Sequence, residues 1–216
     1  MATTHALLGV AVAALSYPLV GEHVGAPLVL AAAFCGGLAP DIDVFGHHRK
    51  TMHFPVGYTG LAAAATAGVA LAPSTTTVLV AAGLGTAALH ALSDVFGGSP
   101  EPEPWNPTVE RAVFNHLLGR WHRPRRYVRY SGAPEDFLLG LGAGLVAIAA
   151  PATPGAVASV LWGVLAFSAV YTLSRKRLGE LSRLLAAIAP GRLSLPSIRV
   201  VEHEDGGTTV AVRFQE

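Results

Sequence analysis

Charged residues are scarce in this sequence. Asp, Glu, Lys and Arg make up 13% of the 216 residues, whereas a soluble domain carries about a quarter. Ala, Val, Leu and Gly fill the difference and bring the mean hydropathy to +0.46. Small apolar residues suit close packing between membrane helices. The composition therefore argues against a soluble all-α protein and favours a membrane protein.

Cysteine is almost absent, and no cleavable leader is evident. The single cysteine, Cys35, lies in an apolar run, excludes a disulfide within the chain and is expected to be a small core or lipid-facing residue. The first apolar run begins at Ala6 without a basic segment before it, and no small-residue cleavage pattern follows. We therefore interpret this run as a first membrane helix.

Six apolar runs dominate the sequence instead. A helix that spans a bilayer needs about 20 residues, with about 17 as a lower limit. The second and fifth runs are the weakest by this measure. Together the runs predict an all-α, multi-pass transmembrane helix bundle of about six helices within residues 1–174. They cover residues 6–20, 24–39, 55–73, 76–93, 137–150 and 155–173.

All 15 basic residues fall on one side of such a bundle. The links after the first, third and fifth runs hold no Lys or Arg, whereas residues 39–54, 95–136 and 175–216 hold every one. Basic loops remain in the cytoplasm. We therefore expect a cell-membrane protein with both termini in the cytoplasm and with membrane lipids as its partners.

The two long basic segments have patterns of their own. In the 95–136 loop, residues 108–118 predict a short amphipathic helix with Thr108 as its N-cap. Basic and aromatic residues at 121–127 favour lipid headgroups over nucleic acid. The cytosolic tail, residues 175–216, predicts an amphipathic helix followed by a β-hairpin around Asp-Gly-Gly. An isolated hairpin is only marginally stable, so this one is expected to dock on another part of the protein.

Polar residues gather where the apolar runs end. His90 and Asp94 lie four apart at the end of the fourth run, which places them on one helix face about 5–6 Å apart. They can share a divalent cation, although a His–Asp hydrogen bond that closes a helix end is an equal alternative. Asp41 and Asp43 follow the second run. One of them can bind metal or act as a base while the other caps a helix or orients an imidazole; a polar turn at the membrane boundary is the alternative.

Two further histidines stand at helix starts. Taken alone, His5 would be an interfacial histidine, and His53 would be part of a basic loop that anchors the third helix. In the six-span topology, however, these two starts and the two polar helix ends described above lie at the same membrane face. The shared placement predicts a divalent metal site, for which zinc is expected before manganese or magnesium. The predicted ligands are His5, Asp41, His53, His90 and Asp94.

The same residues resemble a known family. The motifs are His-x3-Gly (His5, Gly9), Pro-Asp-Ile-Asp (residues 40–43), His-Arg-x3-His (His48, Arg49, His53) and His-x3-Asp (His90, Asp94). In this order they are similar to the YdjM-like membrane-bound metal-dependent hydrolases, over roughly residues 1–110. That family is distantly similar to zinc-dependent phospholipase C and the P1-type nucleases. The resemblance implies that His53, His90 and Asp94 hold one metal, that Asp41 ligates it or activates water, and that His5 lies nearby.

The resulting hypothesis is a metal-dependent hydrolase that acts on a phosphoester, in a small-molecule or lipid-linked substrate, at the cytoplasmic membrane face. A bound metal would lower the pKa of a water and polarise the ester. Asp41 or Asp43 would take the proton, and Arg49 or Lys50 would steady a phosphate. Two other classes stay open. One is a transporter or ion-handling protein, because intramembrane ionisable residues mark ion pathways; the other is a non-catalytic membrane protein with a structural metal site.

Overall fold

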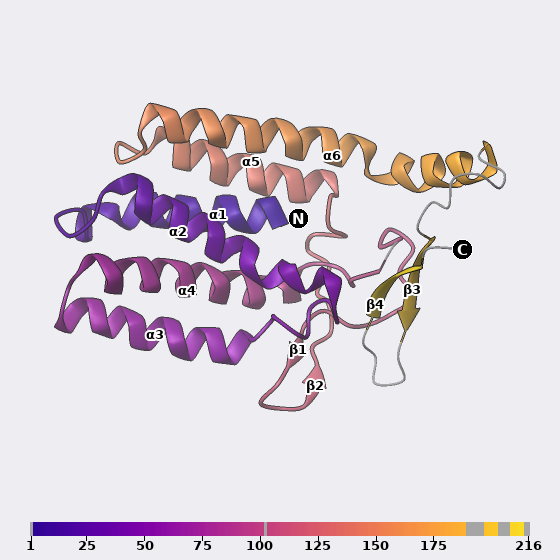
Figure 1. Ribbon diagram of the computed structural model, residues 1–216, viewed down its shortest axis with the longest axis horizontal. Coiled ribbons are helices and arrows are strands. Elements are labelled where there is room, and N and C mark those ends of the chain that lie inside the picture. The colour runs from indigo at the N-terminus through magenta and orange to yellow at the C-terminus, as the bar shows by residue number, and fades with distance from the viewer. Residues whose placement is uncertain (1, 102, 189–196, 203–207, 214–216) are drawn as a thin grey trace.

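The structure is a computed structural model that describes residues 2–101, 103–188, 197–202 and 208–213 (Figure 1). Within these residues there are six α-helices: α1 (Ala2–Ser16), α2 (Ala26–Leu38), α3 (Pro55–Leu71), α4 (Thr75–Ser93), α5 (Pro134–Ala149) and α6 (Gly155–Ile188). Three short 3-10 helices directly continue α1, α2 and α4, namely η1 (Tyr17–Leu19), η2 (Ala39–Phe45) and η3 (Asp94–Phe96).

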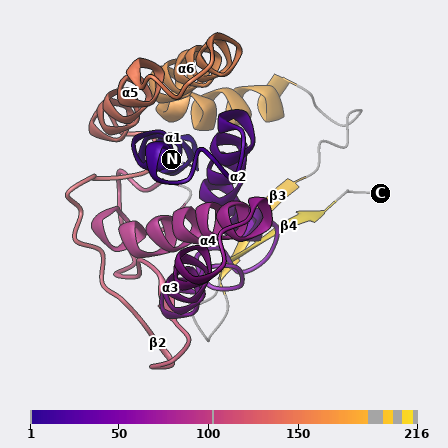
Figure 2. The same ribbon diagram turned by 90° about the vertical axis from the view of Figure 1, so that its left-hand side faces the viewer.

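The helices run side by side along the long axis of the molecule (Figures 1 and 2). Contacts link them in the order α3, α4, α2, α1, α5 and α6, and α1 also touches α4. At one end of the bundle, on the right of Figure 1, α1 and α3 begin while α2 and α4 end. The 95–136 loop lies at that same end. The predicted convergence of four helix ends is therefore present in the fold.

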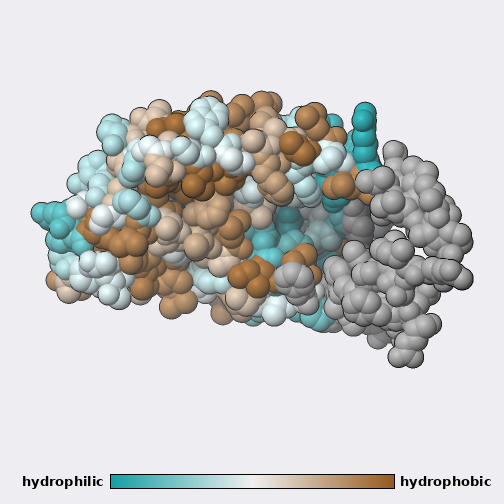
Figure 3. All heavy atoms as spheres, turned by 45° about the horizontal axis from the view of Figure 1, so that its top comes forward, coloured by the Kyte–Doolittle hydropathy of each residue, from teal (hydrophilic) through white to brown (hydrophobic). Residues whose placement is uncertain are grey.

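Within the described residues, four segments are long and apolar enough to cross a membrane, which indicates a membrane protein. They are Ala2–Leu19, Ala26–Val44, Thr75–Phe96 and Gly155–Leu178. Each of the six predicted apolar runs forms a helix, but α3 and α5 are shorter than these four, at 17 and 16 residues. Large apolar side chains such as Leu15 and Phe167, both 64% exposed, lie on the outside of the bundle. Figure 3 shows apolar residues over much of this outer surface.

Glycines allow α1, α2 and α4 to approach closely. A Cβ at Gly36 of α2 would collide with the Gly83 carbonyl and the Thr86 hydroxyl of α4, and a Cβ at Gly37 would collide with the backbone of Ala6 in α1. Small residues at helix contacts permit such backbone approach in membranes. The last turn of α2 is thereby held between two neighbours, where the polar side chains of three helices meet.

The 95–136 loop contains a small hairpin in place of the helix predicted at residues 108–118. Its strands are β1 (Phe114–Asn115) and β2 (Arg120–Trp121), which pair antiparallel. The Asn115 side-chain oxygen accepts a hydrogen bond from the Leu118 amide at 3.0 Å and closes the turn. Thr108, the predicted N-cap, donates both its amide and its hydroxyl to Glu101. The helix prediction was wrong because these side-chain bonds offer the backbone an alternative to a helix.

The tail continues α6 before it reaches a second hairpin. α6 is uninterrupted, so the predicted surface helix is its C-terminal part, and the predicted boundary between residues 174 and 175 lies inside it. Strands β3 (Ser197–Glu202) and β4 (Thr208–Arg213) pair antiparallel, with Ser197 opposite Arg213. The predicted turn at residues 203–207 lies outside the described residues, and docking of the hairpin stays a prediction.

Candidate metal centre

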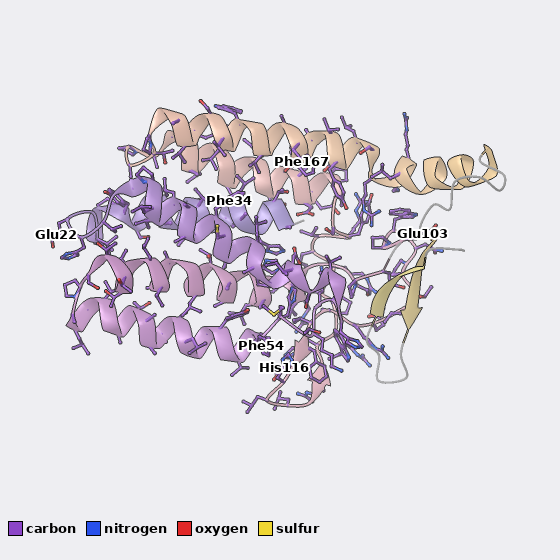
Figure 4. All side chains as sticks on the ribbon, in the orientation of Figure 1. Glu22, Phe34, Phe54, Glu103, His116 and Phe167 are labelled. Carbon is purple, nitrogen blue, oxygen red and sulfur yellow. The ribbon has the colours of Figure 1, made fainter. Side chains whose placement is uncertain are left out.

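The polar residues at the helix ends meet in one cluster. The predicted ligands come from four regions: His5 from the start of α1, Asp41 from η2, His53 from the segment before α3, and His90 and Asp94 from the junction of α4 and η3. Ligand atoms of His5, His90 and Asp94 lie within 4.8 Å of one another, and so do those of Asp41, His53 and His90. Figure 4 shows nitrogen- and oxygen-bearing side chains crowded at this end of the helices. The two groups of three share His90.

Hydrogen bonds on the far side of each ring orient His53 and His90. The Nδ1 atom of His53 lies 2.9 Å from a carboxylate oxygen of Asp43, and the Nδ1 atom of His90 lies 2.6 Å from the carbonyl oxygen of Gly37. Because an ionised carboxylate and a carbonyl only accept, each Nδ1 donates. In the neutral ring, Nε2 then carries the lone pair. Metal-binding histidines are commonly held in this way.

Both Nε2 atoms are buried, and neither has a hydrogen-bond partner among the described residues; the same is true of Oδ2 of Asp94. This oxygen lies 3.1 Å from Nε2 of His53 and 3.7 Å from Nε2 of His90. Oδ1 of Asp41 lies 3.4 Å from Nε2 of His90 and 3.7 Å from Nε2 of His53. Buried polar atoms without partners cost free energy. Two imidazoles and two carboxylates are also the number and kind of ligand that a zinc site uses, so the group fits a metal ion.

His5 extends the cluster. Its ring stacks on that of His90, with centroids 4.0 Å apart. The Nε2 atom of His5 lies 3.3 Å from Oδ1 of Asp94, and its Nδ1 atom lies 3.0 Å from the Ser93 hydroxyl. Ser93 donates its proton to the carbonyl oxygen of His90, so its oxygen accepts from Nδ1 of His5. In the neutral ring of His5, the lone pair is therefore on Nε2, the atom nearest Asp94, as it is in the neutral forms of His53 and His90.

Asp43 is enclosed and serves three donors. Its carboxylate accepts hydrogen bonds from Nδ1 of His53, from the Met52 amide at 3.1 Å and from Nδ1 of His48 at 2.8 Å. Both of its oxygens are therefore engaged. The sequence left open which of the two aspartates orients an imidazole. The structure gives that position to Asp43 and leaves the side chain of Asp41 24% exposed.

Arg49 is buried and does not face open space. Its guanidinium donates to the carbonyl oxygens of Gly98 at 2.6 Å and Ala112 at 3.4 Å, and its Nε atom lies 3.4 Å from Oδ2 of Asp94. The side chain connects the 95–136 loop to a carboxylate of the cluster. That Arg49 or Lys50 steadies a phosphate stays a prediction.

Negative charge exceeds positive charge in the cluster. The carboxylates of Asp41, Asp43 and Asp94 surround the histidines, and Arg49 contributes one guanidinium. Burial disfavours a charged His53, but the carboxylates of Asp43 and Asp94 outweigh burial and raise the pKa of His53 to about 9. The surroundings of this ring therefore favour positive charge, which a proton on Nε2 facing Asp94 supplies and which a metal ion would supply in its place. When the imidazoles are neutral, the negative charge of the three carboxylates exceeds the positive charge of Arg49, and a divalent ion would neutralise this excess.

A cavity of about 320 Å³ opens onto Asp41. Its lining includes Val44, His48, Ser131 and Phe167. Phe167 belongs to the apolar segment Gly155–Leu178, so this wall continues onto the outer surface of the bundle. On the face shown in Figure 3, hydrophilic residues lie in a hollow between the apolar helical surface and the grey residues. The cluster is therefore reached from a space with one polar and one apolar side.

Three parts of the site were not predicted as site residues. His48 contacts Asp43 and lines the cavity, Ser93 holds His5, and the Gly37 carbonyl holds a second imidazole. His48 had a signal, because it begins the His-Arg-x3-His motif. The Gly37 carbonyl had none, since a backbone contact between two helices depends on how closely they pack.

Comparison with known proteins adds no relative. No family model matches the chain, and no match is found among the curated proteins or the solved structures. The chemistry of the cluster is therefore inferred from its own residues.

Proposed function

We propose that the chain is a membrane-bound, metal-dependent hydrolase that acts on a phosphoester in a lipid or lipid-linked substrate. The buried, unpartnered Nε2 atoms of His53 and His90, which face carboxylate oxygens, are the observation that carries the proposal. The motif resemblance to the YdjM-like hydrolases agrees with it. We place the protein in the cell membrane with six spans and both termini in the cytoplasm, on the distribution of basic residues.

His53, His90 and Asp94 would hold the ion and leave a fourth position for water, with Asp41 beside that water and His5 at the edge of the site. Mixed nitrogen and oxygen ligands suit zinc best, whereas magnesium prefers oxygen alone and manganese lies between them. When bound, the ion would lower the pKa of a water and polarise the phosphoryl group. Asp43 and the Gly37 carbonyl would keep the two imidazoles turned toward it.

Asp41 would take the proton from the attacking water. It is the cluster carboxylate that lines the cavity, whereas Asp43 is saturated with donors and Asp94 is buried against Arg49. A base must reach the water that it deprotonates, which favours Asp41 on geometry. Arg49 would act as a positioning residue that balances the charge of Asp94.

The cavity supports an amphiphilic substrate. A phosphoryl group would lie near Asp41 and His48, and an apolar chain would lie against Val44 and Phe167, which are 41% and 64% exposed. Because Phe167 belongs to a segment that can span the membrane, such a chain would reach the cavity without leaving the bilayer.

A structural metal site is the second candidate. His53, His90 and Asp94 are at most 3% exposed, as in closed sites that only stabilise a fold. The two candidates differ in what Asp41 does, because a structural ion needs no exposed carboxylate beside it.

The deciding measurement is metal content by mass spectrometry together with phosphodiester hydrolysis, both on detergent-purified protein. We expect close to one transition-metal ion per chain in the wild type, its loss in His90→Gln, and no change in the control His23→Gln, which lies at the opposite end of the bundle.

Asp41→Asn should retain more metal than His90→Gln yet lose hydrolysis of bis(p-nitrophenyl) phosphate by at least about 100-fold, as for loss of a general base. Metal bound without hydrolysis in the wild type would favour the structural site. A wild type that binds no zinc or manganese even after addition would refute both.

A further inference from the structure

The β1–β2 hairpin ends in an exposed apolar tip. Leu117 and Leu118 in its turn are 75% and 54% exposed. The neighbouring Gly119 and Arg120 are exposed as well. Two adjacent leucines at the tip of a polar loop are not needed to close the turn, which the Asn115 side chain already does. Their exposure indicates a partner surface.

The base of this hairpin is fixed to the segment that leads into α3. The Phe114 amide donates to the carbonyl oxygen of Arg49 at 3.0 Å. The His116 ring lies 4.5 Å from the ring of Phe54, which directly precedes the first residue of α3 (Figure 4). The tip begins one residue after His116. Its leucines therefore lie near the point where an apolar helix of the bundle begins.

The surroundings of the tip resemble a membrane interface. α3 exposes Val56 in its first turn, at 45%. Trp121 follows the turn and packs against Phe114 with centroids 5.5 Å apart, and Arg120 lies between it and the leucines. Tryptophan and basic side chains collect at the headgroup level of bilayers, with apolar side chains below them.

We propose that residues 116–121 form a membrane-docking finger. Leu117 and Leu118 insert among lipid chains beside α3, while Arg120 and Trp121 lie at the headgroups. The partner is the bilayer, because the finger is anchored to a bundle whose apolar outer surface already requires one. The finger is part of the 95–136 loop, whose backbone carbonyls accept hydrogen bonds from Arg49 beside the metal centre. Docking of the finger therefore helps to hold this loop against the centre. The proposal does not depend on metal or on hydrolysis.

Spin labels report the depth of the tip. Cys35→Ala removes the single cysteine, and Leu118→Cys then carries the only label. The matched references are Leu61→Cys, 55% exposed on α3, and Asn106→Cys, an exposed loop residue close to Glu103, which Figure 4 places beyond the ends of α2 and α4. Each variant is reconstituted in liposomes of phosphatidylethanolamine and phosphatidylglycerol. Relaxation by oxygen, which concentrates in the bilayer, is compared with relaxation by a water-soluble nickel chelate.

A label at residue 118 should resemble the Leu61 reference, with high oxygen and low nickel accessibility. Nickel accessibility like that of the Asn106 reference would overturn the proposal. Low accessibility to both reagents would also overturn it, because the tip would then be covered by protein.

A check without a label uses Trp121. In the variant Trp105→Phe/Trp162→Phe it is the only tryptophan. Lipids brominated near the headgroup should quench its fluorescence in the reconstituted protein. Replacing Leu117 and Leu118 with serine should reduce that quenching. Equal quenching with and without the leucines would show that they do not hold the finger in the bilayer.

Discussion

The orientation of single imidazole rings decides what the cluster can do. His53 is held by a carboxylate and His90 by a backbone carbonyl, so the two rings present the same nitrogen to the same space through different supports. A carboxylate makes the ring that it holds more basic than a carbonyl does. His53 is therefore expected to be the stronger of the two imidazole ligands, and Asp43 to matter as much as a residue that touches the ion.

Asp43→Asn tests this support. The substituted amide keeps the size of the side chain but loses its charge, and its NH₂ group faces a ring nitrogen that also donates. We expect zinc affinity to fall about 10–100-fold, as for other residues that orient a ligand. Competition with a chromophoric chelator measures the affinity, and Glu22→Gln, at an exposed position at the other end of the bundle, is the control. Unchanged affinity in Asp43→Asn would mean that His53 is oriented without it.

The residues that meet in the cluster could be predicted from the sequence, but the contacts that each of them makes could not. His5, His53 and the His90–Asp94 pair were placed together by counting helix ends, because consecutive spans reverse direction. The roles of Asp41 and Asp43 depend on η2, since residues two apart point in different directions on a 3-10 helix. No sequence pattern indicates that 3-10 helix, and burial of Arg49 by the 95–136 loop could not be predicted either, because it depends on contacts between distant segments.

Among the elements, close contacts between helices position the site. The Gly36 contact brings α2 against α4, and the neighbouring Gly37 supplies the carbonyl that orients His90. The helices themselves were predictable, because continuous apolar runs leave few alternatives. The β1–β2 hairpin was not, because residues 108–118 have a helical pattern that only local side-chain bonds overrule.

Two alanine substitutions separate helix packing from helix propensity. Gly36→Ala places a methyl group against the Gly83 carbonyl and should destabilise the protein by about 1–3 kcal/mol, as overpacking does. Gly85→Ala, in α4 but away from α2, meets no atom within 4 Å and should be neutral or stabilise by up to about 1 kcal/mol. Thermal unfolding in detergent gives the comparison. Equal changes in Tm for the two variants would show that α2 and α4 can move apart without loss of stability.

In the whole molecule, the cluster joins the start of α1, η2, the segment before α3 and the end of α4. An ion held by His53, His90 and Asp94 would cross-link the start of α3 to the end of α4 and η3, beside Asp41 of η2. A ligand that binds only the folded state stabilises it by about 4 kcal/mol at 1,000 times its dissociation constant. The bundle should therefore depend on metal for part of its stability.

Metal removal tests this dependence. EDTA should lower the Tm of the wild type by several degrees, and added zinc should restore it. The double variant His53→Gln/His90→Gln should start from a lower Tm and respond to neither reagent. A wild type whose Tm is the same with and without chelator would show that the helices hold together without the ion.

The order of the residues along the chain has a consequence for biosynthesis. Every candidate ligand lies between His5 and Asp94, whereas Phe167, which walls the cavity, is translated more than seventy residues after Asp94. A ribosome therefore releases a full set of ligands while α5 and α6 are still unmade. An ion present at that moment can be captured by the nascent helices, and the later pair then closes over a centre that is already loaded.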